Sequence, residues 1–264
     1  MTALIITAVL AALATVGFIA VRILKAPIYG LFAKIVASVG FITISVTALT
    51  IKDIVFIPYG APLIILGLVL GLIGDIVLDV KRIHGLSASL ITGESEFEVN
   101  LKKEHIKFEG LYLTSGMVSF FAGHIVFLVA VCLIATEFFG LTENREFLFP
   151  IAVSAGIGIA MGPVTIIISE KLLKADFGKH KILAGAYGGL LIFFTVFTLW
   201  LTILEPAFLL LFLGTLCFLL SDLVLSQMYF CEGKKEDKIL VAVNHALYYS
   251  AQILIACWLF TLVL

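Results

Sequence analysis

Residues 59–79 read YGAPLIILGLVLGLIGDIVLD, and this stretch decides the fold. It contains only two charged side chains, Asp75 and Asp79, both near its end. About 20 apolar residues in a helix are enough to cross the hydrocarbon core of a membrane. The stretch therefore predicts a transmembrane helix that carries Asp75 inside the membrane.

The rest of the chain has a similar composition. Of its 264 residues, 62% are hydrophobic and 13% are charged, about half the usual ~25% of soluble domains. These values exclude a soluble enzyme and a disordered chain, and the net charge of −1 gives no attraction to nucleic acid. We predict an all-α polytopic membrane protein, with residues 1–264 forming a single integral-membrane domain. The eight predicted transmembrane helices are Thr2–Val21, Gly30–Thr50, Tyr59–Asp79, Leu111–Ala135, Phe149–Ile168, Ile182–Ile203, Pro206–Met228 and Ile239–Val263.

Positive charge is unevenly distributed between the loops. Of the 17 basic residues, all except Lys52 and Arg145 are assigned to the loops after the first, third, fifth and seventh helices. Arg22 and Lys34 are counted with the first of these loops. Because loops rich in Lys and Arg stay in the cytoplasm, we expect these four loops to be cytoplasmic and both termini to be extracytoplasmic. The longest, residues 80–110, is predicted as a solvated cytoplasmic loop with room for a short surface helix.

The two halves of the chain share two short patterns. Residues 72–78 (LIGDIVL) align with 219–225 (LLSDLVL), and residues 120–127 (FFAGHIVF) align with 248–255 (YYSAQILI). The matches occur in the same order, and each is centred on a polar residue. We therefore predict a 4+4 tandem repeat whose halves have the same orientation in the membrane.

Two carboxyl groups are the main functional candidates. An ionisable residue within a transmembrane helix is costly and points to function. Asp75 lies about 16 residues, or about 24 Å, into its helix. Asp222 lies about as far into the seventh helix, which runs in the same direction. We expect the pair at one depth, a few ångströms inside the cytoplasmic boundary.

Other polar side chains reach the same level. Asn244, Tyr248 and Gln252 are spaced by four residues and form one stripe on the last helix. His124 lies in the middle of the fourth helix. With His245 and Ser221, these residues could line one pocket that opens to the cytoplasm. The alternatives are structural: His124 as a hydrogen-bonded core residue, the tyrosines as packing, Ser221 bonding to its own helix, and Asp79 as an interfacial cap or ion-pair partner.

Four ordered motifs resemble a known family. They are residues 67–78 (GLVLGLIGDIVL), 116–124 (GMVSFFAGH), 214–222 (GTLCFLLSD) and 248–252 (YYSAQ). They are similar to the motifs of the YhhN-like lysoplasmalogenase family, which includes transmembrane protein 86, and they cover nearly the whole chain in order. Gly71 stands where a serine often precedes the Gly-Asp motif, and the segment 80–110 is longer than usual.

The resemblance implies hydrolysis of the vinyl-ether bond of lysoplasmalogens to a fatty aldehyde and a glycerophospho-base. Protonation of the vinyl β-carbon creates an oxocarbenium ion, to which water adds. This chemistry needs one protonated carboxyl and one group that stabilises positive charge or activates water, as in the carboxyl pairs of glycosidases. It needs no metal or other cofactor. A lysophospholipid is then the expected partner, and no nucleic acid is expected.

We assign Asp75 and Asp222 as the catalytic acid and base, without deciding which is the acid. The residues expected to bind the substrate or orient water are His124, Ser221, Asn244, Tyr248 and Gln252.

Three other functions remain open from the sequence. Paired intramembrane carboxyl groups and a repeat also fit a proton-coupled secondary transporter. A metal-dependent lipid amidase would use Asp75, His124, Asp222 and His245 as ligands. A lipid-sensing scaffold would tolerate replacement of both aspartates.

Overall fold

The computed structural model describes residues 2–24, 27–51, 58–89, 96–140, 145–234 and 237–262. Within these ranges the chain forms eight long α-helices and no strand. Each contains an apolar stretch long enough to cross a membrane, which confirms the predicted fold class. The helices are α1 (Thr2–Ile23), α2 (Pro27–Ile51), α3 (Ala61–Ser89), α4 (Glu96–Phe138), α5 (Arg145–Leu172), α6 (Lys181–Leu204), α7 (Leu209–Phe230) and α8 (Lys238–Thr261). The tandem repeat stays a prediction.

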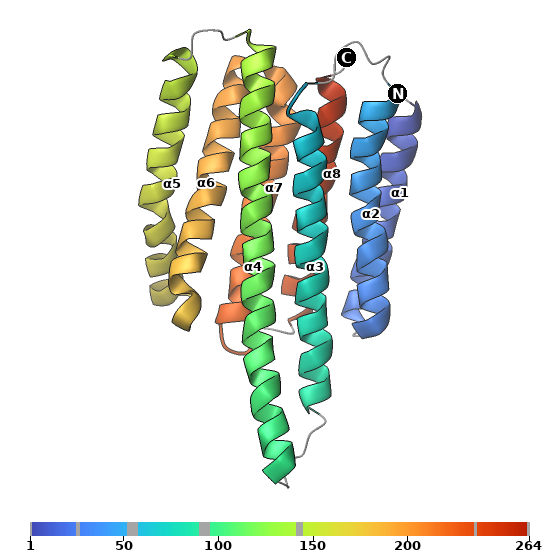
Figure 1. Cartoon of the computed structure of the whole chain (residues 1–264), viewed down its shortest axis with the longest axis vertical. Helices are drawn as coiled ribbons and strands as arrows, with labels where there is room; N and C mark the ends of the chain where they lie inside the picture. Colours follow the sequence, from blue (N-terminus) through green and yellow to red (C-terminus); the bar gives the residue numbers. More distant parts are fainter. Residues whose placement is uncertain are drawn as a thin grey trace.

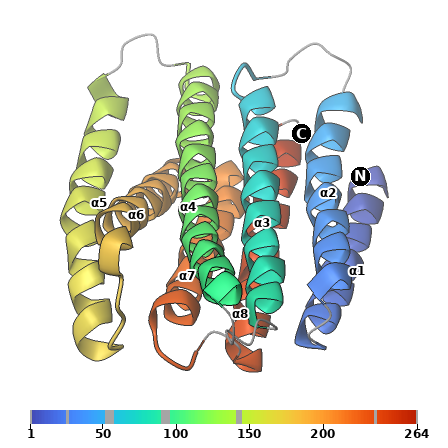
Figure 2. The same cartoon turned by 60° about the horizontal axis from the view of Figure 1, so that its bottom comes forward.

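The helices form one bundle with both termini at the same end (Figure 1). Each odd-numbered helix packs against the next helix along the chain, and α8 also contacts α1, α2 and α3. Figure 2 turns the end opposite the termini toward the reader. In this view α1 and α2 lie on one side of the bundle, α5 and α6 lie on the other side, and α3 and α4 lie in front of α7 and α8. The centre of the bundle is therefore lined by α3, α4, α7 and α8.

The segment 80–110 differs from the predicted loop. Helix α3 continues to Ser89 and α4 begins at Glu96, so the described parts of the segment extend two helices. These ends project beyond the rest of the bundle (Figure 1). Helix in this segment is therefore much longer than the short surface helix that the prediction allowed. Residues 96–109 contain no Gly or Pro and many good helix formers, so they extend α4 outside the apolar span.

Close packing of α5 on α6 depends on glycine. A Cβ added at Gly158 would lie 2.5 Å from the carbonyl oxygen of Gly189, and one at Gly162 would lie 2.6 Å from that of Gly185. Since backbone cannot move away cheaply, these positions accept no side chain. Glycines spaced by four residues, as in Gly158/Gly162 and Gly185/Gly189, are typical of closely packed membrane helices.

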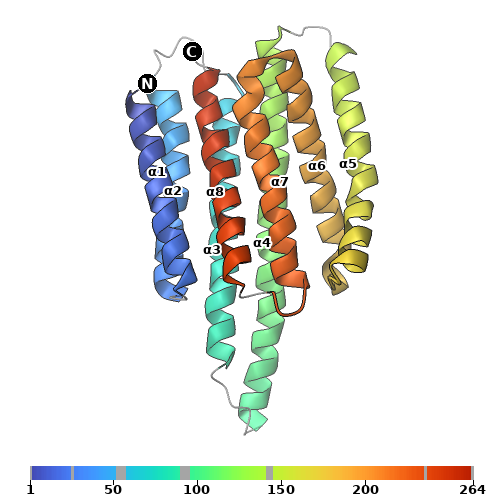
Figure 3. The ribbon, with the colours of Figure 1, turned by 180° about the vertical axis from the view of Figure 1, so that it is seen from behind.

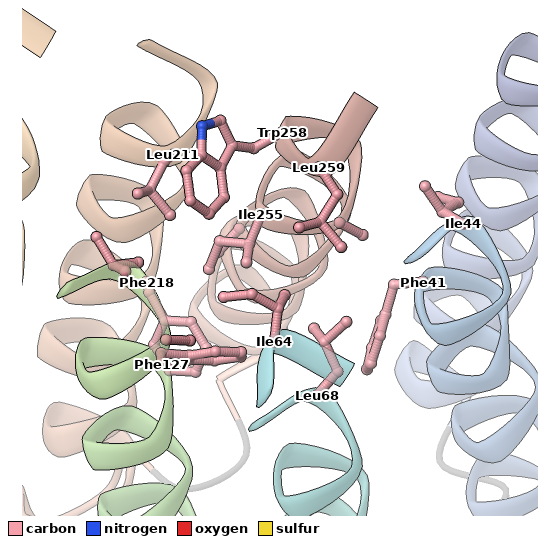
Figure 4. Packing of buried hydrophobic residues seen from close by; sticks show 14 of the residues in the cluster. Phe41, Ile44, Ile64, Leu68, Phe127, Leu211, Phe218, Ile255, Trp258 and Leu259 are labelled. Carbon is pink, nitrogen blue, oxygen red and sulfur yellow. The ribbon is translucent and has the colours of Figure 1, made fainter. Parts of the chain in front are cut away.

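Buried apolar side chains pack between α2, α3, α4, α7 and α8 (Figure 4). It includes Phe41 of α2, Leu68 of α3, Phe127 of α4 and Trp258 of α8, each at most 2% exposed. Phe127 packs where Gly67 has no side chain, since an added Cβ would lie 2.4 Å from its ring. The polar residues described below therefore lie beneath a packed hydrocarbon layer.

Replacement of Gly189 by Ala should weaken the α5–α6 contact, because the new Cβ would lie 2.7 Å from the carbonyl oxygen of Gly158. We expect Gly189→Ala to lower the free energy of unfolding by about 1–3 kcal/mol. Gly156→Ala is the matched control, because no atom lies within 4 Å of its added Cβ. Thermal unfolding in detergent would show the difference, and equal midpoints for the two variants would contradict this account of the contact.

Candidate functional site

The carboxyl group of Asp75 is the most densely bonded polar group in the described bundle. Its side chain is 4% exposed, and its Oδ1 lies 2.9 Å from the Nζ of Lys34 on α2. Tyr248 of α8 donates its hydroxyl to Oδ2 at 2.8 Å, and Ser38 donates to the same oxygen at 3.2 Å. The carboxylate is thus held from α2 and α8 while it projects from α3, and the adjacent ammonium compensates its charge.

A second ion pair extends this group. Asp79 lies one turn after Asp75 on the same face of α3. Its Oδ1 lies 2.9 Å from Nη1 of Arg22 on α1 and 3.7 Å from Nζ of Lys34. Arg22, Asp79, Lys34 and Asp75 therefore form a charge quartet of two cations and two anions. The ion-pair alternative for Asp79 is confirmed, although the residue is only 1% exposed.

Lys34 was missed as a site residue. The sequence interpretation counted it with a cytoplasmic loop, whereas it lies within α2 and is 4% exposed. That assignment was wrong because an unpaired ammonium is costly within the membrane, but a paired one is not. The signal was available, since Lys34 falls inside the predicted helix Gly30–Thr50. Arg22 likewise belongs to α1 and points to the quartet.

The polar stripe of α8 faces α2 and α3. Gln252 donates its Nε2 to the hydroxyl of Tyr248 at 3.0 Å, which orients that hydroxyl for Asp75. Tyr249 donates to the backbone carbonyl of Lys34 at 3.3 Å. A Cβ at Gly71 would lie 2.9 Å from Nε2 of Gln252, so the glycine leaves the space that this amide occupies. Gly71, which stands where the family pattern often has a serine, therefore lies at a contact between α3 and α8.

Ser221 and Asn244 bind each other. The Nδ2 of Asn244 donates to the backbone oxygen of Ser221 at 2.9 Å and to its Oγ at 3.0 Å. The Oγ of Ser221 donates in turn to the backbone oxygen of Asn244 at 3.2 Å. These bonds join α7 to α8 beside Asp222. A role in binding substrate stays a prediction for both.

Asp222 has surroundings unlike those of Asp75. Its Oδ2 is buried and makes no hydrogen bond with any described residue, and the same holds for the hydroxyl of Tyr187 on α6. The carboxyl group of Asp222 and the hydroxyl of Tyr187 are nevertheless close enough to act on each other. Asp222 also interacts electrostatically with Asp75. Tyr187 was not singled out from the sequence, because one tyrosine in an apolar helix carries no pattern.

Two cavities meet at Asp222. One, of about 40 Å³, is lined by the charge quartet and by Asp222, Asn244, His245 and Tyr248. We call it the polar pocket. The other, of about 100 Å³, lies among α4, α5, α6 and α7 and has almost entirely apolar walls. We call it the apolar cavity. Asp222 belongs to the walls of both.

His124 does not join this group. It is 2% exposed, its Nδ1 lies 2.8 Å from the carbonyl oxygen of Phe120, and the ring of Phe218 packs edge-on at 4.3 Å. It lines neither the polar pocket nor the apolar cavity. His245 lines the polar pocket and packs against Phe18 at 4.9 Å. In the parts of the chain that the structure describes, no three His, Cys, Asp or Glu side chains are grouped as metal ligands.

Fold and site together define a polytopic helical membrane protein whose polar pocket is lined by three carboxyl groups, those of Asp75, Asp79 and Asp222. The sequence profile of the YhhN family matches residues 101–259, more than half of the chain. The chain therefore belongs to the YhhN family, which includes lysoplasmalogenases. No curated protein and no solved structure matched it. The matched residues contain Asp222 and Tyr248, whereas Asp75 precedes them.

Removal of the ammonium of Lys34 should leave two buried carboxylates with one cation. We expect Lys34→Met to lower the free energy of unfolding by about 3–5 kcal/mol, and Asp75→Asn in the same chain to restore part of the loss. Lys181→Met is the control, because its ion pair with Glu170 is largely exposed and should contribute less than about 1 kcal/mol. Unfolding in detergent measures all three variants. An additive effect of Lys34→Met and Asp75→Asn would show that the pair is not coupled.

Proposed function

We propose that the protein hydrolyses the vinyl-ether bond of lysoplasmalogens to a fatty aldehyde and a glycerophospho-base. The observation that carries this proposal is the position of Asp222 between the polar pocket and the apolar cavity. The scissile bond of such a lipid joins a polar headgroup to a hydrocarbon chain. A carboxyl group at the junction of a polar and an apolar space is suited to that bond.

The two carboxyl groups receive different roles from their surroundings. Asp75 is the carboxylate, because Lys34, Ser38 and Tyr248 all favour its charge. Asp222 is the acid, because among the described residues no cation pairs with it and an unpaired charge in an apolar setting is costly. Unequal surroundings for two carboxyl groups are how enzymes combine an acid and a base at one pH.

The reaction then proceeds in two stages. Asp222 transfers its proton to the β-carbon of the vinyl ether, and the resulting oxocarbenium ion is stabilised by the negative charge of Asp75. The carboxylate of Asp222 takes a proton from water, whose oxygen bonds to the α-carbon and forms a hemiacetal. The hemiacetal collapses as the bond to the glycerol oxygen breaks. That oxygen gains a proton and the hemiacetal hydroxyl loses one, giving aldehyde and alcohol.

Neighbouring residues hold this arrangement. Tyr248 donates to the Asp75 carboxylate and is itself bonded by Gln252, and the mutual bonds of Ser221 and Asn244 join α7 to α8 next to Asp222. Arg22 lines the polar pocket and is the cation placed to receive the lipid phosphate. With both termini extracytoplasmic, as the basic residues predict, the polar pocket opens toward the cytoplasm.

A transporter is less well supported. Alternating access requires a path from the site to either side of the membrane. Above the polar pocket, the space between α2, α3, α4 and α8 is filled by fully buried apolar side chains such as Phe41, Leu68 and Phe127 (Figure 4). The packing favours a site that substrate enters and products leave on one side only.

Both carboxyl groups should be required for aldehyde release. Purified protein with EDTA present would receive an alkenyl lysophospholipid or its acyl or saturated-ether analogue. We expect aldehyde from the alkenyl substrate alone, and a decrease of at least about 100-fold in Asp75→Asn and Asp222→Asn. Asp176→Asn is the control, because Asp176 lies in the connection between α5 and α6. Unchanged aldehyde release in either catalytic variant would refute the proposed mechanism.

The adjacent tyrosines offer a matched comparison. Tyr248 donates its hydroxyl to the carboxylate of Asp75, whereas Tyr249 donates to a backbone carbonyl. A hydrogen bond to a charged group is worth about 1.5–3 kcal/mol, so Tyr248→Phe should lower kcat about 10- to 150-fold. Tyr249→Phe should change stability more than kcat. Equal kcat values for the two variants would mean that the Tyr248 hydroxyl does not serve the reaction.

A further inference from the structure

Tyr187 carries a buried hydroxyl group to which the proposed reaction assigns no role. It belongs to α6, which contacts α7 and lies between α5 and α7 in Figure 3. Tyr187 and Asp222 both line the apolar cavity, and the two side chains are close enough to act on each other. The hydroxyl and the Oδ2 of Asp222 are both buried without a hydrogen bond to any described residue. Because an unbonded buried polar group is costly, a bond between these two groups would relieve both.

Other hydroxyl groups of the cavity already have partners. Thr165 donates to a carbonyl oxygen one turn earlier in α5 at 2.8 Å, and Ser226 donates to one in the preceding turn of α7, also at 2.8 Å. Short side chains such as these can bond to the backbone of their own helix. The hydroxyl of Tyr187 lies at the far end of a ring and cannot reach the backbone of α6. Its partner must therefore come from another helix, and Asp222 is the acceptor beside it.

The ring of Tyr187 is positioned by α4. Its centroid lies 6.3 Å from that of Phe121 and 5.6 Å from that of His124, which it meets edge-on. The imidazole of His124 is itself oriented, because its Nδ1 lies 2.8 Å from the carbonyl oxygen of Phe120. A carbonyl oxygen only accepts, so Nδ1 carries the hydrogen. These contacts restrict the ring of Tyr187 and keep its hydroxyl next to Asp222.

We propose that Tyr187 is a positioning residue, which donates its hydroxyl to one carboxyl oxygen of Asp222 and so leaves the acidic proton on the other oxygen. A protonated carboxyl group has one carbonyl oxygen and one O–H group, and only the oxygen without hydrogen accepts the phenol freely. Tyr187 keeps its own proton throughout. The inference rests on the proposed function for the acid role of Asp222, but not for the hydrogen bond itself.

The same bond favours transfer of the proton. While Asp222 is protonated, Tyr187 donates to a neutral oxygen. Once the proton has moved to the ligand, Tyr187 donates to a carboxylate, and hydrogen bonds to charged groups are the stronger kind. An interaction that strengthens along the reaction raises its rate, whereas one that is equally strong throughout does not. Tyr187 therefore acts on kcat rather than on KM.

Infrared spectroscopy tests the bond directly. The protein would be held in a detergent without ester groups, whose carbonyl bands would otherwise overlap. A hydrogen bond to the carbonyl oxygen of a protonated carboxyl group lowers the wavenumber of its C=O stretch. We expect a band that Asp222→Asn removes and that Tyr187→Phe shifts to higher wavenumber. Thr165→Val should leave this band in place, because it removes a hydroxyl of the same cavity that is bonded within its own helix.

Aldehyde release from the alkenyl lysophospholipid supplies the second measurement. Tyr187→Phe keeps the ring and removes only the hydroxyl. We expect kcat to fall about tenfold in this variant, while KM changes less than about twofold.

The outcomes separate this inference from the proposed function. A band that Tyr187→Phe leaves unmoved would refute the hydrogen bond, and a shifted band with unchanged kcat would refute the positioning role. A shifted band in protein that releases no aldehyde would support the bond and reject the vinyl-ether reaction. If Asp222→Asn removed no band, Asp222 would be ionised, and both the inference and the acid role of Asp222 would be overturned.

Discussion

The ion pair between Lys34 and Asp75 is the contact on which the rest of the site depends. A lone charge of either sign inside the hydrocarbon layer is costly, and the pair makes both charges tolerable. The pair also joins α2 to α3, while Asp79 adds α1 through Arg22 and Tyr248 adds α8. Four helices that are apolar elsewhere are therefore brought into register by a few polar atoms. A packing arrangement that separated Lys34 from Asp75 would leave a buried charge without a partner.

Asp222 differs from Asp75 in the side chains that surround its carboxyl group. It lies across the polar pocket from the charge quartet, on a helix whose other pocket residues are mostly apolar. The bonds between Ser221 and Asn244 join its helix to α8, and among the described residues no cation pairs with its carboxyl group. Asp75 is surrounded by donors from α2 and α8, whereas Asp222 lines both the polar pocket and the apolar cavity. In the proposed reaction, a ligand in the polar pocket would meet the charge of Asp75 on one side and the acid group of Asp222 on the other.

The sequence predicted the fold well because membrane helices must satisfy their own backbone and present long apolar runs. It also predicted the stripe of Tyr248 and Gln252, since four-residue spacing places them on one face. It did not predict the role of Lys34, because counting basic residues by loop treats every lysine as solvated. His124 was predicted from its mid-helix position and lies among aromatic rings outside the polar pocket, and its role stays a prediction. Tyr187 and the apolar cavity depend on how α6 leans from α4, which no local pattern records.

The polar pocket and the apolar cavity, which meet at Asp222, suit molecules of different polarity. One is lined by charges, and the other is lined mostly by hydrocarbon. A lipid cut at this side chain would yield a hydrophilic fragment on one side and an oily fragment on the other. Each fragment could leave into the phase in which it is soluble, without passing the other. The same geometry that places the cut would therefore sort the products, and a reactive oily product would return to the bilayer without entering water.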